Sequence, residues 1–319
     1  MLTLDRVSKV YKVGTFGGKD LPAVRGVSFE MGPGEVVSLI GESGSGKTTV
    51  GKMILRLISV TTGRISIDGT DIATLGGDGL RAYYRTVQGV FQDPFSSFNP
   101  MYKADHVLGM MRRQYFSGLA DADWLAKVEA SLQAVNLDPG QTLHKYPHQL
   151  SGGQLQRLLV ARALLLDIRY LVADEIISML DASTRIDVLN LLGELRERGL
   201  GILFITHDLS LGNYISDRTV ILRRGNVVEM GATAKVFGNP LHPYSRMLIA
   251  AAPQLHRKWA AVAAELGAGG GPRPEGCLFH RLYPPDRPAG ADGERPTLAR
   301  AEEDHFVGCV RLDGEGACS

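Results

Sequence analysis

The stretch Gly41-Glu42-Ser43-Gly44-Ser45-Gly46-Lys47-Thr48 decides the fold of this chain. It follows an apolar segment, residues 35–40, and precedes residues 49–58, in which apolar side chains recur at helical spacing. Strand, glycine-rich turn and helix in this order are the context that the P-loop pattern requires, so a chance glycine-rich turn is the weaker interpretation. The sequence therefore predicts a phosphate-binding loop between a buried strand and a helix.

The residue types in this loop suit the binding of a nucleoside triphosphate. Glycines let backbone N–H groups approach phosphate oxygens, and the N-terminus of the following helix adds its positive end. We expect the ammonium group of Lys47 to reach the β- and γ-phosphates and the hydroxyl group of Thr48 to bind Mg²⁺. The predicted nucleotide-binding residues of the loop are Gly41, Ser43, Gly44, Ser45, Gly46, Lys47, Thr48 and Thr49.

Two acidic residues end a second apolar strand, which spans residues 170–174. Asp174 is the last residue of that strand, and Glu175 follows it directly. An acid at this position is the usual second magnesium contact, and hydrolysis needs a base that orients and deprotonates water. In a sequence without a P-loop, the better interpretation of the pair would be two solvated acids at the end of a strand. Beside a P-loop, we predict that Asp174 binds Mg²⁺ and that Glu175 is the base.

The order of predicted elements indicates an α/β fold. Strands alternate with helices along most of the chain, which predicts a mostly parallel sheet covered on both faces. Two short strands, residues 2–11 and 24–30, surround a glycine-rich turn at the N-terminus and belong to an antiparallel β subdomain. A largely helical block, about residues 95–168, interrupts the alternation. Composition changes after residue 235, and residues 236–319 are predicted to form a small, loop-rich C-terminal extension.

Composition excludes several classes of protein. The net charge of the 319 residues is +1, so bulk electrostatics give no support to nucleic-acid binding. Three cysteines are too few for a disulfide framework and favour a reducing compartment. The sequence has no apolar run near the roughly 18 residues that span a bilayer and no signal-peptide pattern. We therefore expect a cytoplasmic protein whose membrane role, if any, comes through partners.

The stretch Leu150-Ser151-Gly152-Gly153-Gln154-Leu155-Gln156-Arg157 narrows the prediction further. Ser151 is placed to cap a helix that runs to about Leu166, which makes an anion-binding helix N-terminus. With the P-loop about a hundred residues upstream, residues 1–235 resemble the nucleotide-binding domain of an ATP-binding cassette (ABC) ATPase. The resemblance implies a P-loop NTPase core in which residues 95–168 are the helical subdomain.

The same resemblance assigns further site residues. It implies that Tyr11 stacks on adenine, although a plain strand tyrosine remains an alternative. It identifies Gln92, in Phe91-Gln92-Asp93-Pro94, as the glutamine that contacts Mg²⁺ or the attacking water. It identifies His207 as the histidine that contacts the γ-phosphate. A lone histidine at a strand end is usually structural, but the setting Thr206-His207-Asp208 favours the catalytic role.

Family resemblance also implies an active site shared between two chains. Ser151, Gly152, Gly153 and Gln154 would cap the γ-phosphate bound by the P-loop of the opposite subunit, and Asp181 lies in the D-loop that contacts that subunit. One departure is Ile176, which stands where the family usually has proline after the catalytic glutamate. Proline would restrict φ there. The exchange removes no catalytic group, so we expect activity to survive it.

Two segments resemble importers of the oligopeptide/dipeptide type, and within them the F-type ATPase subunit. These are residues 91–100 and Asn239-Pro240-Leu241-His242-Pro243-Tyr244-Ser245-Arg246. Such importers pair two different ATPases with two transmembrane permeases and an extracytoplasmic solute-binding protein. The resemblance thus implies a peripheral protein on the cytoplasmic face of the membrane. Phe95, Phe98, Met101 and Tyr102 are candidates for a permease groove or, equally, for packing under the helical block.

The C-terminal extension departs from this resemblance in its cysteines. Relatives of this type often carry four, a pattern compatible with an iron–sulfur cluster. Here Cys277 and Cys309 match its two ends, Tyr283 replaces the second cysteine, and Cys318 lies too near the terminus to substitute. We therefore expect ATP and Mg²⁺ as ligands and no iron–sulfur cluster.

Two other functions compete with import. A soluble ABC ATPase acting on ribosomes or DNA would usually carry two cassettes or long coiled coils, and the sequence has one P-loop and no sustained heptads. An exporter subunit is disfavoured by the two importer-like segments, but only by analogy. The transported solute, whether peptide, oligosaccharide or nickel, is not encoded in this chain.

Overall fold

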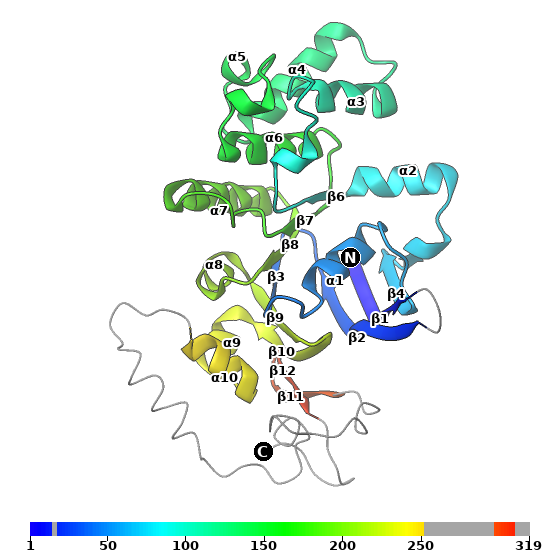
Figure 1. Cartoon of the computed structure of the whole chain (residues 1–319), viewed down its shortest axis with the longest axis vertical. Coiled ribbons are helices and arrows are strands. Elements are labelled where there is room, and N and C mark those ends of the chain that lie inside the picture. The colour runs from blue at the N-terminus through cyan, green and yellow to red at the C-terminus, as the bar shows by residue number, and fades with distance from the viewer. Residues whose placement is uncertain (15–17, 252–296, 310–319) are drawn as a thin grey trace. The chain divides into compact units, whose positions relative to one another are not determined.

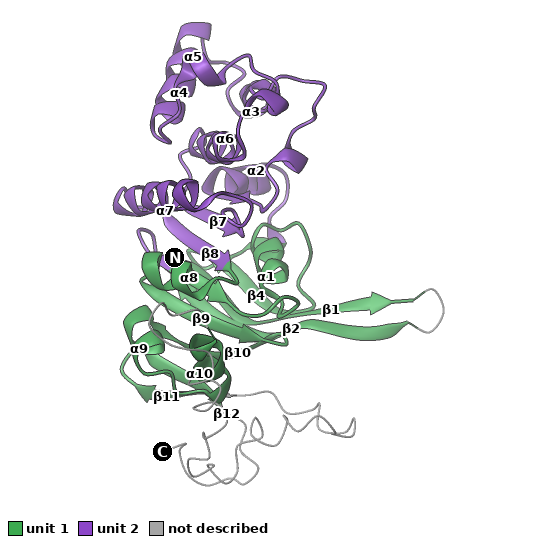
Figure 2. Cartoon of the chain, turned by 60° about the vertical axis from the view of Figure 1, so that its left-hand side comes forward, with its two compact units in different colours: residues 1–30, 37–73, 206–319 green, residues 31–36, 74–205 purple. Residues whose placement is uncertain are grey.

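The computed structural model describes residues 1–14, 18–251 and 297–309. The chain divides into two compact units (Figure 2). Unit 1 comprises residues 1–30, 37–73 and 206–319, and unit 2 comprises residues 31–36 and 74–205.

Unit 1 contains the predicted antiparallel β subdomain. Its four-stranded sheet has the order β2-β1-β4-β5 and is formed by β1 (Leu2–Val13), β2 (Lys19–Met31), β4 (Thr62–Ile67) and β5 (Thr70–Asp71). Leu2 and Leu4 of β1 are buried and pair in register with Ile67 and Ile65 of β4. The strand β2 begins earlier than the sequence predicts, at Lys19, and it lies next to β1 in the sheet.

The second sheet region of unit 1 supports the P-loop. The strands β3 (Val36–Ile40) and β9 (Arg218–Arg223) are parallel, and β10 (Asn226–Ala232), β12 (His305–Cys309) and β11 (Thr297–Glu302) follow in antiparallel pairing. All five residues of β3 are buried, which fits its mostly apolar sequence. Its one polar residue, Ser38, has its hydroxyl oxygen 3.1 Å from that of Thr219 in β9. The strands β11 and β12 show that part of the C-terminal extension joins the sheet at β10, which the sequence did not predict.

The helices of unit 1 are short. They are α1 (Lys47–Ile54), α8 (Leu209–Ile215), α9 (Thr233–Gly238) and α10 (Pro243–Ala250), with the 3-10 turn η1 at Ile72–Thr74. The prediction that the first helix continues to residue 58 is wrong. Arg56 has a left-handed φ of 53°, and the N–H of Leu57 donates to the carbonyl oxygen of Lys52 at 2.9 Å, which closes the helix at its C-terminus. Leu57 is consequently exposed although its spacing suits a helix.

Unit 2 contains a parallel sheet of order β8-β7-β6, formed by β6 (Val87–Val90), β7 (Tyr170–Asp174) and β8 (Gly201–Thr206). Each residue of β7 and β8 is buried, as expected for a sheet covered on both faces. The longer helices α2 (Gly77–Thr86), α6 (Gly152–Leu164) and α7 (Ala182–Glu197) accompany these strands. The prediction of a mostly parallel α/β sheet with a separate antiparallel subdomain is confirmed.

A cluster of helices precedes the signature segment in unit 2. It contains η2 (Phe95–Ser97), α3 (His106–Tyr115), α4 (Asp121–Gln133), α5 (Pro139–Thr142) and η3 (Pro147–Gln149), and α3 and α4 pack on α6 (Figure 1). Val128 and Leu132 of α4 are buried, whereas Leu125, one turn earlier at the same helical spacing, is exposed. Within the ranges that the structure describes, every helix is too short or too polar to cross a lipid bilayer.

Candidate functional site: a P-loop and a signature helix

The P-loop connects β3 to α1 in unit 1. Lys47 is buried, and its Nζ atom donates to the carbonyl oxygens of Gly41 at 2.7 Å and Glu42 at 2.9 Å. The N–H of Ser45 donates to the same Glu42 carbonyl oxygen at 3.1 Å. The lysine side chain is thus folded into the loop, where its ammonium group lies among backbone carbonyls.

Two positions of the loop require glycine because backbone atoms of other segments lie very close to them. A Cβ atom at Gly41 would lie 2.1 Å from the carbonyl oxygen of Leu222, and one at Gly46 would lie 2.4 Å from the carbonyl oxygen of Ala23. Gly46 also has a left-handed φ of 105°. Both positions therefore admit glycine alone, and α1 begins after Gly46 with no side chain capping its N–H groups.

A turn that the sequence did not single out supports the loop from outside. The N–H of Gly225, between β9 and β10, donates to the carbonyl oxygen of Ser45 at 2.8 Å. The N–H of Arg25 in turn donates to the carbonyl oxygen of Gly225 at 2.8 Å. Gly225 has a φ of 82°, a backbone conformation that favours glycine. The run Arg224-Gly225-Asn226 is therefore the sequence feature that could have predicted this turn.

Two more predicted site residues belong to unit 1. Tyr11 is half-buried on β1, and the Nζ atom of Lys9 lies 5.3 Å from the centre of its ring. His207 is exposed directly after β8. The next residue, Asp208, accepts the N–H of Ser210 at 2.9 Å and so caps α8. This cap orients the backbone beside His207.

The two predicted acids lie at the end of β7 in unit 2. Asp174 is buried, with 5% of its surface exposed. Glu175 has a left-handed φ of 51°, which is rare for a residue with a side chain. Its N–H donates to the carbonyl oxygen of Ile205 at 2.9 Å, and its carbonyl oxygen accepts the Ser178 Oγ–H at 2.9 Å. These bonds hold a strained backbone at the candidate base.

Ile176, the departure from the family pattern, is buried next to this turn with 1% of its surface exposed. The apolar side chain therefore contributes to packing, and hydrogen bonds of its neighbours hold the turn without the restriction that proline would give. Ser178, whose N–H also donates to the carbonyl oxygen of Glu175 at 3.1 Å, supplies one of those bonds.

The signature segment begins α6 as predicted. Ser151 Oγ accepts the N–H of Gln154 at 3.2 Å, and Gln154 Oε1 accepts the N–H of Ser151 at 2.9 Å, which is a complete capping box. A Cβ atom at Gly153 would lie 2.4 Å from Cγ2 of Thr184, in the first turn of α7. The glycine therefore permits close contact between the signature helix and the helix that follows the D-loop.

Asp181 caps α7. Its Oδ1 atom accepts the N–H of Thr184 at 2.9 Å and the hydroxyl group of Ser183 at 2.7 Å. Its Oδ2 atom accepts the hydroxyl group of Thr184 at 2.8 Å. The Ser183 hydroxyl bond is the largest of the contributions that hold the pKa of Asp181 well below its usual range. Within unit 2, the first turn of the signature helix therefore lies against the first turn of α7, which Asp181 caps.

Gln92 is exposed in the loop after β6. The loop and the strand before it are both attached to α6. Gln156 Nε2 donates to the carbonyl oxygen of Phe91 in the loop at 3.4 Å, and Arg162 Nη2 donates to that of Gly89 in β6 at 3.0 Å. Of the aromatic and methionine residues that follow, Phe98 is buried, whereas Phe95, Met101 and Tyr102 are exposed. Phe98 therefore packs internally, and the other three remain on the surface of unit 2.

Comparison with known proteins decides the family. The model of the ABC transporter family matches residues 24–178, and that of the oligopeptide/dipeptide transporter C-terminal region matches residues 228–282. A putative peptide import ATP-binding protein of Brucella ovis is 40% identical over 291 residues, which cover 89% of this chain and 90% of that protein. The chain belongs to the ATP-binding proteins of ABC transporters.

Further relatives agree with this assignment. The oligopeptide transport ATP-binding protein OppF of Salmonella typhimurium is 36% identical over 302 residues, covering 92% of this chain and 89% of that protein. AppF of Bacillus subtilis is 37% identical over 331 residues, covering 97% and 96%. A solved ATP-binding cassette dimer, in a post-hydrolysis state with ADP and Pi, has a TM-score of 0.65 and 29% identity, and covers 73% of this chain and 99% of its own. The chain is thus an ATP-hydrolysing, energy-coupling subunit of an ABC transporter.

Proposed function

We propose that this subunit couples ATP hydrolysis to the import of peptides or similar solutes. The observation that carries the proposal is a complete P-loop and a complete signature in one chain, together with the matching oligopeptide/dipeptide transporter C-terminal region. The names of the relatives, which refer to peptide import and oligopeptide transport, support the same solute class. The partners would be a second ATPase subunit, two permeases and an extracytoplasmic solute-binding protein, with this chain peripheral on the cytoplasmic face of the membrane.

The nucleotide would be shared between two ATPase subunits. Lys47 and the N-terminus of α1 would bind the phosphates, and Tyr11 would stack on adenine. The residues 151–154 would cap the γ-phosphate held by the partner, and Asp181 would lie against that partner. The dimeric cassette with ADP and Pi supports this arrangement by analogy. ATP would then hold the two subunits together, and hydrolysis to ADP and phosphate would release them.

Mg²⁺ fits the chemistry of the remaining side chains. The Thr48 hydroxyl group, the Gln92 amide oxygen and the Asp174 carboxylate are hard oxygen donors, which Mg²⁺ prefers. Asp174 is largely buried, as suits a carboxylate that shares a site with a cation. When bound, the ion would neutralise charge on the phosphate oxygens. The remaining steps fall to residues of this chain.

Glu175 would accept a proton of the attacking water as the water oxygen bonds to the γ-phosphorus and the bond from that phosphorus to the leaving ADP oxygen breaks. Its left-handed backbone is held by hydrogen bonds with Ile205 and Ser178. His207 would contact the γ-phosphate and donate to the charge that develops there.

A Glu175→Gln variant tests the base. We expect it to bind ATP, to hydrolyse it at least about 100-fold more slowly, and to accumulate as a closed ATP-bound dimer in the assembled transporter. Turnover and size-exclusion behaviour with ATP measure both effects. Near-normal turnover would exclude Glu175 as the base.

A Ser151→Arg variant tests the shared site. The arginine would fill the space before α6, so hydrolysis at the partner's P-loop should be lost while the ATP affinity of this chain's own P-loop is retained. ATP titration of the isolated subunit and turnover of the assembled transporter separate the two. If the isolated Ser151→Arg subunit lost its ATP affinity, the proposal that the nucleotide site is shared between two chains would be contradicted.

We also propose that residues 1–235 form the nucleotide-binding domain, with residues 95–168 as its helical subdomain, and that residues 236–319 are an extension without an iron–sulfur cluster. Cys277, Tyr283 and Cys318, on which the last prediction depends, lie outside the described residues. Stoichiometric iron and sulfide in purified protein would overturn it.

A further inference from the structure

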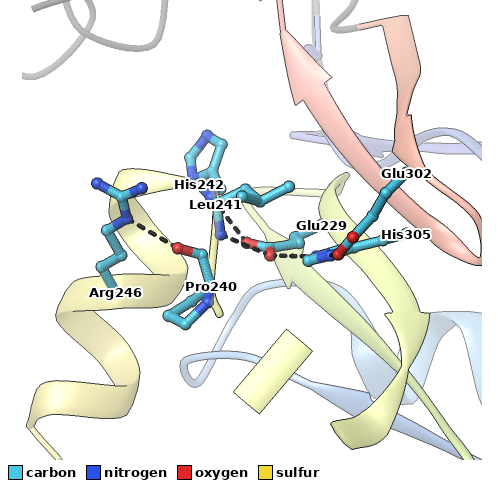
Figure 3. Close-up of polar contacts among 7 residues, drawn as sticks. All are labelled: Glu229, Pro240, Leu241, His242, Arg246, Glu302 and His305. Atoms are coloured by element: carbon cyan, nitrogen blue, oxygen red, sulfur yellow. Dashed lines mark hydrogen bonds and ion pairs between the residues drawn. The ribbon is translucent and has the colours of Figure 1, made fainter. Parts of the chain in front are cut away.

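The C-terminal extension is attached to the sheet of unit 1 by a buried carboxylate. Glu229 of β10 is fully buried, and its two oxygens accept successive backbone N–H groups at the start of the extension (Figure 3). Oε1 accepts the N–H of Leu241 at 2.8 Å, and Oε2 accepts that of His242 at 2.9 Å. A buried carboxylate that receives backbone N–H groups binds them tightly, because both partners are removed from water.

A second part of the extension reaches the same carboxylate. His305 of β12 is fully buried, with Nε2 at 2.7 Å from Glu229 Oε1 and Nδ1 at 3.0 Å from Glu302 Oε1 (Figure 3). The hydrogen bond with His305 is the main cause that lowers the pKa of Glu302. Segments about 60 residues apart in the sequence therefore share one anchor on β10.

This anchor determines how α10 begins. His242 caps the helix, since its Nδ1 atom accepts the N–H of Tyr244 at 3.0 Å. Arg246 Nε donates to the carbonyl oxygen of Pro240 at 2.8 Å and closes the turn from the other side (Figure 3). Pro243 occupies the first helical position, where its restricted φ is favourable. The backbone at Tyr244 is thus held by the Glu229 anchor, by the His242 cap and by the bond between Arg246 and Pro240.

The side chain of Tyr244 reaches the P-loop. It is buried, with 2% of its surface exposed, and its hydroxyl oxygen accepts the N–H of Glu42 at 3.3 Å. The guanidinium group of Arg223 lies 4.2 Å from the centre of its ring, a favourable cation–π distance. Burial raises the pKa of Tyr244 to about 12, so the phenol is neutral at physiological pH.

Glu42 is held from both sides. Its N–H donates to Tyr244, and its carbonyl oxygen accepts the Lys47 ammonium group and the N–H of Ser45. We propose that Tyr244 is a positioning residue for the P-loop, through which the C-terminal extension sets the backbone that orients Lys47. The proposal rests on the proposed role of Lys47 in phosphate binding and goes beyond it by giving the extension a part in nucleotide affinity.

A Tyr244→Phe variant tests the proposal, since it keeps the ring over Arg223 and removes only the hydroxyl group. We expect the affinity for a fluorescent ATP analogue to fall about three- to ten-fold, because the hydrogen bonds of the hydroxyl group with the backbone and side chain of Glu42 are lost. In the assembled transporter, KM for ATP should rise by a similar factor while kcat changes less than two-fold. A general loss of folding would instead lower the active fraction and leave KM unchanged.

Tyr170→Phe is the matched control. Tyr170 is also fully buried and has an arginine, Arg169, over its ring at 5.7 Å, but it lies at the start of β7 in unit 2. Nucleotide affinity should be unchanged in this variant. Equal affinity in Tyr244→Phe and wild type, or equal losses in both variants, would overturn the proposal.

Two further variants complete the experiment. Lys47→Ala should lose nucleotide affinity, and if it does not, the proposed role of the P-loop lysine fails and not only the inference on Tyr244. His305→Ala, in the full chain, removes a contact of the anchor without touching the P-loop, and should weaken nucleotide binding in the same direction as Tyr244→Phe. Unchanged affinity in a folded His305→Ala protein would overturn the involvement of the extension.

Discussion

Two helices of this protein begin after glycine-rich segments, yet their N-termini differ. The helix α1 follows the P-loop, and its capping residue Gly46 has a left-handed backbone and no side chain that accepts a helical N–H. The helix α6 follows the signature, and Ser151 and Gln154 exchange hydrogen bonds across its first turn. Both helices have a positive N-terminal end. Only at α6 does a side chain of the helix start, Ser151, accept one of the N–H groups of the first turn.

This difference concerns how each glycine-rich helix start is stabilised. At α1 no side chain caps the N-terminus, and we expect a bound phosphate to accept hydrogen bonds there. At α6 the capping box stabilises the helix before any ligand arrives. We therefore expect α1 to depend on nucleotide for part of its stability, and α6 to be formed independently of it.

Gly46→Ala should break the P-loop side of the comparison and have the largest effect. The added methyl group would meet the backbone carbonyl oxygen of Ala23, and backbone atoms there have little room to move. We expect a loss of about 3 kcal/mol in the free energy of unfolding and at least a ten-fold loss of ATP affinity. Chemical denaturation and ATP titration measure these changes.

Gly44→Ala is its control, because Gly44 also has a positive φ, of 78°, but a Cβ atom there would meet nothing within 4 Å. Only backbone strain remains, and about 1 kcal/mol of stability should be lost. Equal effects at both positions would show that strain, and not the contact with Ala23, sets the loss.

Gly153→Ala should have an intermediate effect, on the signature side. The methyl group would press on the Cγ2 atom of Thr184, a side chain that can adjust at a cost of about 1–3 kcal/mol in stability. Nucleotide affinity of the isolated subunit should not change, because the P-loop is unaltered. Gly152→Ala, whose Cβ atom would make only an ordinary 3.6 Å contact with Leu180, should be nearly neutral in denaturant unfolding.

Asp181→Ala should have the smallest effect, and it extends the comparison to a third helix start. The folded-state pKa of Asp181 is lowered, so its contribution to stability is fully present above the unfolded pKa, near 4, and is lost as pH falls towards the folded value. The difference in Tm between wild type and variant should therefore shrink between about pH 5 and pH 3. A constant difference over that range would mean that the cap does not depend on the charge of Asp181.

Much of the fold was accessible from the sequence because its signals are local. A buried strand next to the P-loop, an acid at the end of residues 170–174 and a serine three residues before its capping-box partner each depend on neighbours in the chain. The end of α1 was not accessible, since Leu57 has helical spacing but Arg56 adopts a left-handed backbone that stops the helix. The left-handed φ of Glu175 could not be predicted either, because glutamate, unlike glycine or asparagine, does not favour that conformation.

The sequence by itself determined the family of this protein, an ATP-hydrolysing ABC transporter subunit, because the P-loop and signature motifs are runs of neighbouring residues that can be recognised without the fold. Only the tertiary structure decided what surrounds the loop: the Gly225 N–H on Ser45, and Tyr244 on Glu42. Those contacts join residues about 180 and 200 positions apart through single hydrogen bonds. Such bonds leave no periodicity or spacing in the sequence, because they depend on where the folded sheet and α10 place two distant backbones.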